Sequence, residues 1–190
     1  MRQSHIFASV VREILEAELL RSTTALPLTI TQFHLLRLMS LGGHYHLSDL
    51  AAFLGVSAPA ATKNVDKLER LGLAIRTPSA GDRRATWLTL SQEGERLVGE
   101  FEARKAARLT PVLRAFPAAH LGALTQLLAR ISVSLVRTET GKGAARVCLR
   151  CAAYIDDECP IGEVLGGCPY QVARHAREAA DAERGGGKAR

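Results

Sequence analysis

The chain has 190 residues, which is enough for one ordinary domain or two small ones with a hydrophobic core. Hydrophobic residues make up 47% and charged residues 23%, a composition that excludes disordered and fibrous proteins. The 25 basic residues exceed the 19 acidic ones, and the net charge of +6 is compatible with a nucleic-acid partner without requiring one. No secretory signal is visible, and no apolar stretch approaches the ~20 residues that span a bilayer. We therefore expect a cytoplasmic protein that does not contact a membrane.

Both ends of the first 138 residues carry helical patterns. Apolar residues recur at helical spacing over residues 3–22, which predicts an N-terminal helix. A second long pattern begins at Ser91, is interrupted at Pro111 and at Pro117, and resumes over residues 121–135; we expect Pro117 to begin a new helix. These Leu-rich ends have little else to pack on within one chain, so pairing with a second copy is expected.

The middle of the chain, residues 28–95, alternates short helical patterns with two strand-like runs. The predicted helices, with their capping residues, are Ile30–Leu41 after Thr29, Asp49–Leu54 after Ser48, and a third helix after Ser57 that stops at Leu71-Gly72. The second and third helices are joined by a tight link at Gly55-Val56, and the third is polar on its outer face, which indicates a helix-turn-helix. Alternation in residues 42–47 predicts an exposed turn that carries His44 and His46.

A hairpin is predicted after the third helix. Its strands are Leu73–Thr77 and Arg84–Leu90, rich in β-branched and aromatic residues, and residues 78–82 form the turn between them. A helix-turn-helix followed by a hairpin with a basic tip is a winged helix. The predicted fold class is therefore mainly α with a small β-hairpin wing: a winged helix-turn-helix flanked by dimerisation helices.

The third helix and the hairpin tip carry the candidate DNA-binding residues. On the helix these are Ser57, Ala58, Thr62, Lys63, Asn64, Lys67 and Arg70, and on the hairpin Arg83 and Arg84. Small side chains at the start of the helix let it enter a major groove, where Lys63 and Asn64 reach base edges. Arg83 and Arg84 suit a narrow minor groove, whose negative potential favours arginine. The alternative is that these charges only form a solvent-exposed helix face and an ordinary hairpin. That alternative accounts well for any single residue, but it accounts poorly for the whole set in this order and spacing.

Residues 28–98 resemble the multiple-antibiotic-resistance regulator (MarR) family of bacterial transcription factors. The resemblance lies in the helix pair LSDLAAFLGVS, the junction VDKLERLGLAIR and the wing GDRRATWLTLSQEG. It implies an obligate homodimer with interleaved terminal helices, and one winged helix per subunit on a pseudo-palindromic operator in double-stranded DNA. It places residues 57–70 in the major groove and Asp82, Arg83 and Arg84 on the wing. Lys63 and Lys67 stand where arginine is commoner in the family, so the planar fork of a guanidinium is lost there.

The chain is accordingly divided into five parts. These are an N-terminal dimerisation helix (1–27), a winged helix-turn-helix (28–95), C-terminal dimerisation helices (96–138), a four-cysteine extension (139–175) and a basic flexible tail (176–190). The family core ends near Arg137, so the extension is an addition to it.

All four cysteines fall in that extension, at Cys148, Cys151, Cys159 and Cys168. Without a signal peptide, clustered cysteines favour a metal or cluster over disulfides. Their spacing lacks the second short-spaced pair of a zinc ribbon, and two of them precede proline, as is seen around iron–sulfur clusters. We expect an iron–sulfur cluster of the [4Fe–4S] type; zinc, or thiols that form disulfides under oxidant, are the alternatives.

Three functions remain open at this point. The first is a repressor whose DNA binding responds to the state of the cluster. The second is a repressor that binds a small hydrophobic effector and carries zinc in its extension. The third is a redox protein that uses the winged helix only for protein contacts. No Ser/His/Asp or paired-carboxylate arrangement stands out, so we do not expect an enzyme.

Overall fold

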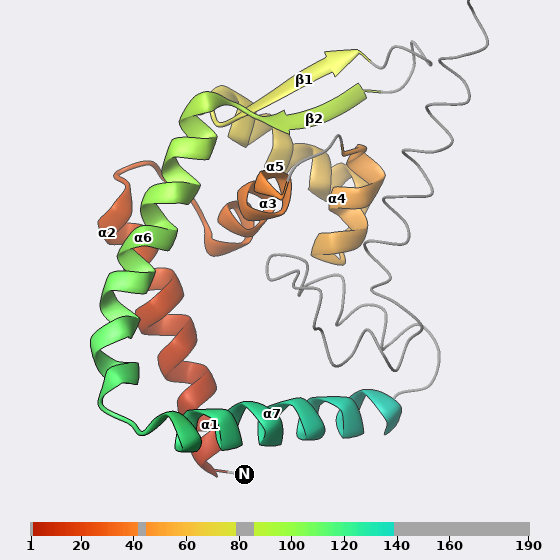
Figure 1. The fold of residues 1–190 in the computed structure, drawn as a ribbon. Coiled ribbons are helices and arrows are strands. Elements are labelled where there is room, and N and C mark those ends of the chain that lie inside the picture. Colours follow the sequence, from red (N-terminus) through yellow and green to blue (C-terminus); the bar gives the residue numbers. More distant parts are fainter. Residues whose placement is uncertain (1, 42–44, 79–85, 139–190) are drawn as a thin grey trace, which may run out of the picture.

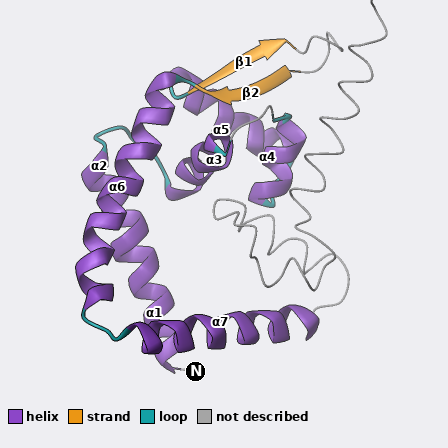
Figure 2. Ribbon diagram, in the orientation of Figure 1, coloured by secondary structure: helices purple, strands orange, loops and turns teal. Residues whose placement is uncertain are grey.

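The computed structural model describes residues 2–41, 45–78 and 86–138 (Figure 1). Its elements in chain order are α1 (Arg2–Val10), the π-helical stretch η1 (Val11–Glu18), α2 (Leu19–Thr23), α3 (Ile30–Ser40), α4 (Leu47–Leu54), α5 (Ala58–Arg70), β1 (Ala74–Pro78), β2 (Thr86–Leu90), α6 (Gln92–Arg114) and α7 (Ala118–Thr138). Helices dominate, and the two strands form one antiparallel sheet (Figure 2). The predicted fold class, mainly α with a β-hairpin wing, is confirmed.

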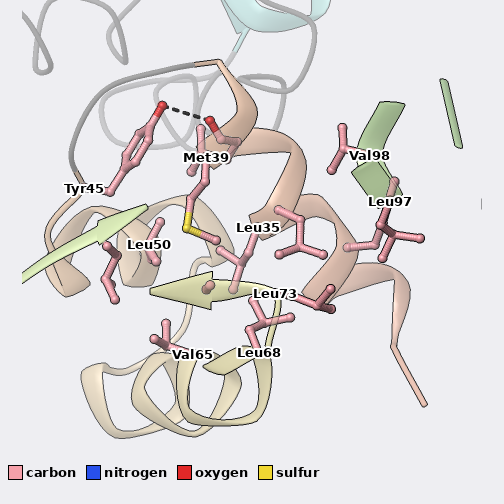
Figure 3. Packing of buried hydrophobic residues seen from close by; sticks show 14 of the residues in the cluster. Leu35, Met39, Tyr45, Leu50, Val65, Leu68, Leu73, Leu97 and Val98 are labelled. Atoms are coloured by element: carbon pink, nitrogen blue, oxygen red, sulfur yellow. Dashed lines mark hydrogen bonds between the residues drawn. The ribbon is translucent and has the colours of Figure 1, made fainter. Parts of the chain in front are cut away.

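The hydrophobic core lies within the winged helix and is built around α3. Leu35, Leu36 and Leu38 are fully buried there, and Figure 3 shows apolar side chains from α4, α5 and the start of the wing converging on this helix. The first half of α6 closes the core, with Phe101 against Phe33 at 4.3 Å between ring centroids. Burial of these aliphatic side chains is what fixes α5 against α3 and so orients its opposite face.

Helix starts follow local hydrogen bonds. Thr29 caps α3, as predicted, and it forms a reciprocal capping box with Gln32 that the sequence analysis did not predict. The prediction of Ser48 as a cap is wrong: α4 begins at Leu47, two residues before the predicted start at Asp49, and its cap is His46, whose backbone N–H donates to Asp49 Oδ2 at 2.9 Å. Ser57 does precede α5, but its side chain makes no capping hydrogen bond.

The expected exposed turn over residues 42–47 is wrong where the structure describes it, at Tyr45 and His46. Tyr45 is 1% exposed, pairs through its backbone with Leu88 of β2, and donates its hydroxyl to the Leu38 carbonyl at 2.8 Å (Figure 3). The His46 ring stacks on Trp87, with 4.2 Å between centroids. The alternating pattern therefore reflects one residue added to the wing sheet, with its large side chain directed into the core.

The two prolines in the C-terminal helical region behave differently. Pro117 immediately precedes α7 and its carbonyl accepts from His120 and Leu121, so it begins a new helix as predicted. Pro111 does not interrupt α6, which continues to Arg114. Only one turn of helix follows Pro111, so few backbone hydrogen bonds depend on the geometry there.

The terminal helices leave large apolar side chains in solvent. α6 runs from the wing past α3 and alongside α2, and α7 lies at the end of the molecule opposite the wing (Figure 1). The exposed residues are Ile6, Phe7 and Val10 on α1, Val112 and Leu113 at the end of α6, Phe116 in the link that follows it, and Leu124, Leu127, Leu128, Ile131 and Leu135 on α7. Val136 is the one buried residue of α7 among those described.

The helix α7 corrects one expectation. It has 21 residues and a mean hydropathy of 1.3 over its most apolar 18-residue window, which is long and apolar enough to cross a membrane by length and composition alone. The sequence concealed this because Gln126, Arg130 and several hydroxyl residues break the apolar run. Of that window, 6% is buried. The apolar surface of such a helix must be covered by protein or by lipid, and the length of the helix does not distinguish the two.

Candidate nucleic-acid interface

The helix α5 presents two different faces. Ala61, Val65 and Leu68 are fully buried against the core, at the i, i+4 and i+7 spacing of one helix side. On the opposite side Lys63 and Arg70 are exposed. The outer face is thus cationic and open to solvent, while the inner face fixes its orientation.

The N-terminus of α5 is also open. Ser57 and Ala58 are exposed, the Ser57 hydroxyl makes no capping bond, and Pro59 occupies the first turn, where its missing N–H costs little. The aligned peptide dipoles of a 13-residue helix put partial positive charge at this end, which favours an anion such as a phosphate. Thr62, one turn further along, is half-buried and donates its hydroxyl to the Ala58 carbonyl at 2.9 Å.

Two residues predicted to contact DNA are also tied to the protein itself. The Asn64 amide oxygen accepts from Gln32 Nε2 at 3.1 Å, and its amide nitrogen donates to the Ala60 carbonyl at 2.9 Å. Lys67 donates its ammonium to the Pro27 carbonyl. Asn64 therefore packs α5 against α3, and the sequence did not indicate Gln32 as its partner.

The wing contributes a residue that the sequence prediction missed. Arg76 on β1 directs its guanidinium at α5, with Nη2 2.6 Å from Asp66 Oδ1 and Nε 3.2 Å from Glu69 Oε2. Its backbone pairs with Leu88 of β2 in the register of the hairpin. The two acidic side chains of α5 are thus paired with the wing, and Lys63, Lys67 and Arg70 provide the cationic character of the helix.

A cavity of about 460 Å³ lies beside this ion pair, between the start of α4, α5 and the wing. Thr62 and Arg76 line it together with residues 46–48 and β2.

The remaining predicted site residues lie outside the described part of the chain. These are Asp82, Arg83 and Arg84 at the hairpin tip, and the cysteines at 148, 151, 159 and 168. Within the described ranges, there is no cluster of three or more His, Cys, Asp or Glu residues that could hold a metal ion.

Comparison with known proteins assigns this winged helix to a family. Residues 26–85, which contain α3, α4, α5 and the first wing strand β1, match the MarR family. This part of the chain is therefore similar to the MarR family. Proteins of this family are DNA-binding regulators of transcription and not enzymes, which agrees with a site made of a helix face and a hairpin.

Several solved structures share the fold at low sequence identity. FabT of Streptococcus pneumoniae, solved in complex with DNA, is 18% identical, with a TM-score of 0.62 over 73% of this chain and 98% of FabT. RV1404 of Mycobacterium tuberculosis is 23% identical, with a TM-score of 0.61 over 70% of this chain and 90% of that one. MepR, a transcription regulator of the Staphylococcus aureus multidrug efflux pump MepA, is 19% identical, with a TM-score of 0.56 over 70% and 97%. At these identities the likeness concerns the fold.

Proposed function

We propose that this MarR-type regulator binds double-stranded DNA as a homodimer and represses transcription from a pseudo-palindromic operator. The observation that carries the proposal is the outer face of α5, where Lys63, Lys67 and Arg70 lie opposite a fully buried apolar face. A helix presented in this way fits the major groove, and its cations lie where phosphates pass. The solved complex of FabT with DNA supports the same use of the shared fold.

The dimer is supported by the apolar side chains of the terminal helices. Five large hydrophobic residues of α7 are between 46% and 61% exposed in the single chain, and α1, the end of α6 and the link that follows it add six more. A monomer rarely leaves so much apolar surface in water, and a second copy would cover it. Two recognition helices ~34 Å apart would then read successive turns of one duplex face. A cytoplasmic location follows from this role, with α7 covered by protein and not by lipid.

The test combines oligomeric state with DNA affinity. Sedimentation should give twice the mass of one chain, and a labelled duplex from upstream of the chain's own coding sequence should be bound in a salt-dependent manner. Replacing Leu127 and Ile131 with Asp should give a monomer that loses most operator binding. Replacing the exposed Arg114 with Asp is the control, since it adds negative charge nearby without removing apolar surface. A wild-type monomer, or no binding to duplex at low salt, would refute the proposal.

We further propose that Cys148, Cys151, Cys159 and Cys168 hold a [4Fe–4S] cluster whose state controls operator binding. The donor set fits, because four thiolates complete the coordination of such a cluster. They would equally satisfy zinc. A cluster would supply sensitivity to oxidant, and its loss would release the segment that carries the cysteines and shift the population competent for DNA.

Metal analysis separates this proposal from its alternatives. Anaerobically purified protein should contain iron and sulfide, absorb visible light, and lose both with Cys148→Ser, with a change in operator affinity. If the protein contains zinc in place of iron, and removal of the zinc leaves operator affinity unchanged, the result favours a regulator that responds to a small molecule and carries a structural metal. A protein that holds a cluster but ignores duplex DNA would be a redox protein instead.

A further inference from the structure

The helix α5 carries two carboxylates, Asp66 and Glu69, which are unfavourable in a helix that contacts DNA phosphates. Asp66 follows Lys63 by three residues and precedes Arg70 by four, so helical spacing puts it among the cations of the outer face. Its side chain is 44% exposed. Glu69 lies on the same helix, toward the wing, and its side chain is 28% exposed. Directed at a duplex, either carboxylate would repel phosphates and offset a neighbouring lysine or arginine.

Both carboxylates are paired with the wing. A single guanidinium, that of Arg76, binds Asp66 through Nη2 at 2.6 Å and Glu69 through Nε at 3.2 Å. Because Arg76 lies on β1, these contacts pull the acidic side chains toward the hairpin. Arginine suits this position because its planar fork can serve two carboxylates at once, which the single point charge of lysine does not do.

We propose that Arg76 is a positioning residue for DNA binding, which holds Asp66 and Glu69 against the wing so that DNA meets only the cations of α5. The proposal rests on the proposed function, since it assigns a role within that DNA-binding surface. Arg76 acts through the two carboxylates and not by contact with DNA, because its guanidinium is committed to them. Its side chain is 35% exposed, so we expect its ion pairs to add little to stability.

The experiment is a mutant cycle on DNA affinity. The probe is a 30-bp duplex selected by the wild-type protein from a random pool, and binding is followed by fluorescence anisotropy over a range of salt concentrations. Arg76→Gln should weaken binding by about fivefold to twentyfold, since two carboxylates become free to approach the phosphates. The pair Asp66→Asn and Glu69→Gln should change the affinity by less than about threefold when Arg76 is present. The same pair should restore binding when Arg76 is replaced by Gln.

Arg96 offers a matched control. On α6 it also bridges two carboxylates, with Nη2 2.6 Å from Glu93 Oε1 and Nη1 3.0 Å from Glu100 Oε2. Arg96→Gln removes the same charge from the same kind of pairing, outside α5 and the wing, and should leave DNA affinity nearly unchanged. Thermal unfolding of every variant should match that of the wild type, which separates an effect on binding from a loss of fold.

Three outcomes would count against the inference. If the triple variant binds as weakly as Arg76→Gln, and the slope of log K against log salt falls by about one, Arg76 itself contacts a phosphate. If Arg76→Gln binds as the wild type does, Arg76 has no role in binding, and the proposed function stands without it. If the wild-type protein selects no duplex, the proposed function fails and this inference fails with it.

Discussion

The guanidinium of Arg37 lies against the carboxylate of Glu102, with Nε 2.8 Å from Oε1. The Arg37 side chain is 8% exposed and that of Glu102 is 39% exposed, so the pair is covered on one side. Arg37 belongs to α3, the centre of the winged helix, and Glu102 belongs to α6, which continues toward the terminal helices. The ion pair therefore joins the DNA-binding part of the chain to the part proposed to dimerise. A change in the angle between these parts must either move the pair as a unit or break it.

Glu102→Ala should lower the free energy of unfolding by about 1–3 kcal/mol, because a buried guanidinium loses a carboxylate that offsets its desolvation. Urea unfolding measures the change. Glu95→Ala, which removes an exposed carboxylate from the same helix, should cost little. Equal losses for the two variants would show that the pair with Arg37 adds nothing to stability.

Two glycines of α6 should respond to alanine in opposite directions. A Cβ at Gly94 would lie 2.2 Å from the Leu73 carbonyl oxygen, which is backbone and cannot rotate away, so Gly94→Ala should destabilise the fold by ~3 kcal/mol. A Cβ at Gly99 meets nothing within 4 Å, so Gly99→Ala should stabilise by about 0.5–1 kcal/mol through helix propensity. Thermal or urea unfolding of the two variants measures both effects. A stable Gly94→Ala variant would contradict the close approach of Leu73, and a destabilised Gly99→Ala variant would contradict the open space at Gly99.

His34 should make the stability of the protein depend on pH. Burial lowers its pKa below the ordinary value of 6.5; Glu16 raises the pKa, and Arg37 and Lys105 lower it. Because the folded-state pKa is the lower one, the unfolded chain binds the proton more readily. Stability is therefore complete above pH 6.5 and falls as the pH drops from there toward the folded-state pKa, by at most about 1.4 kcal/mol per pH unit.

His34→Gln should reduce that decline in stability, measured as the free energy of unfolding between pH 7 and pH 5 in urea. The matched control is His5→Gln, which removes an exposed imidazole from α1. If the control flattens the profile as much as His34→Gln does, the buried imidazole is not the cause.

Substitutions of Lys63 and of its neighbour Asn64 should affect different properties, DNA affinity for Lys63 and stability for Asn64. Lys63→Ala should weaken binding across all sequences and reduce the salt slope by about one, with stability unchanged, because the side chain is exposed. Asn64→Ala should cost ~1 kcal/mol of stability, because the hydrogen bond from Gln32 is lost. Anisotropy titrations and urea unfolding of both variants provide the four measurements. An Asn64→Ala variant of wild-type stability but altered base preference would favour the original prediction that Asn64 reads bases.

The order of the elements was predictable because the signals are local. The Thr29 capping box, the glycine at 55 with its φ of 65°, and the apolar spacing of α5 each depend on residues within a few positions of one another. The errors came where a local signal had two interpretations. Residue 45 alternates with polar neighbours both in an exposed turn and in a strand edge, and only contact with Leu88 distinguishes the two.

The sequence by itself determined the winged helix and the cationic face of α5, since periodicity and composition state which side of a helix is polar. The tertiary structure alone decided how the acidic side chains of that face are paired, because Arg76 reaches them only once the wing folds back on α5. It also decided that Asn64 packs against Gln32, 32 positions away along the chain. Periodicity shows which face of a helix or strand is buried. Which residues pack against that face is decided by burial of the whole core, and a local sequence pattern carries no information about that.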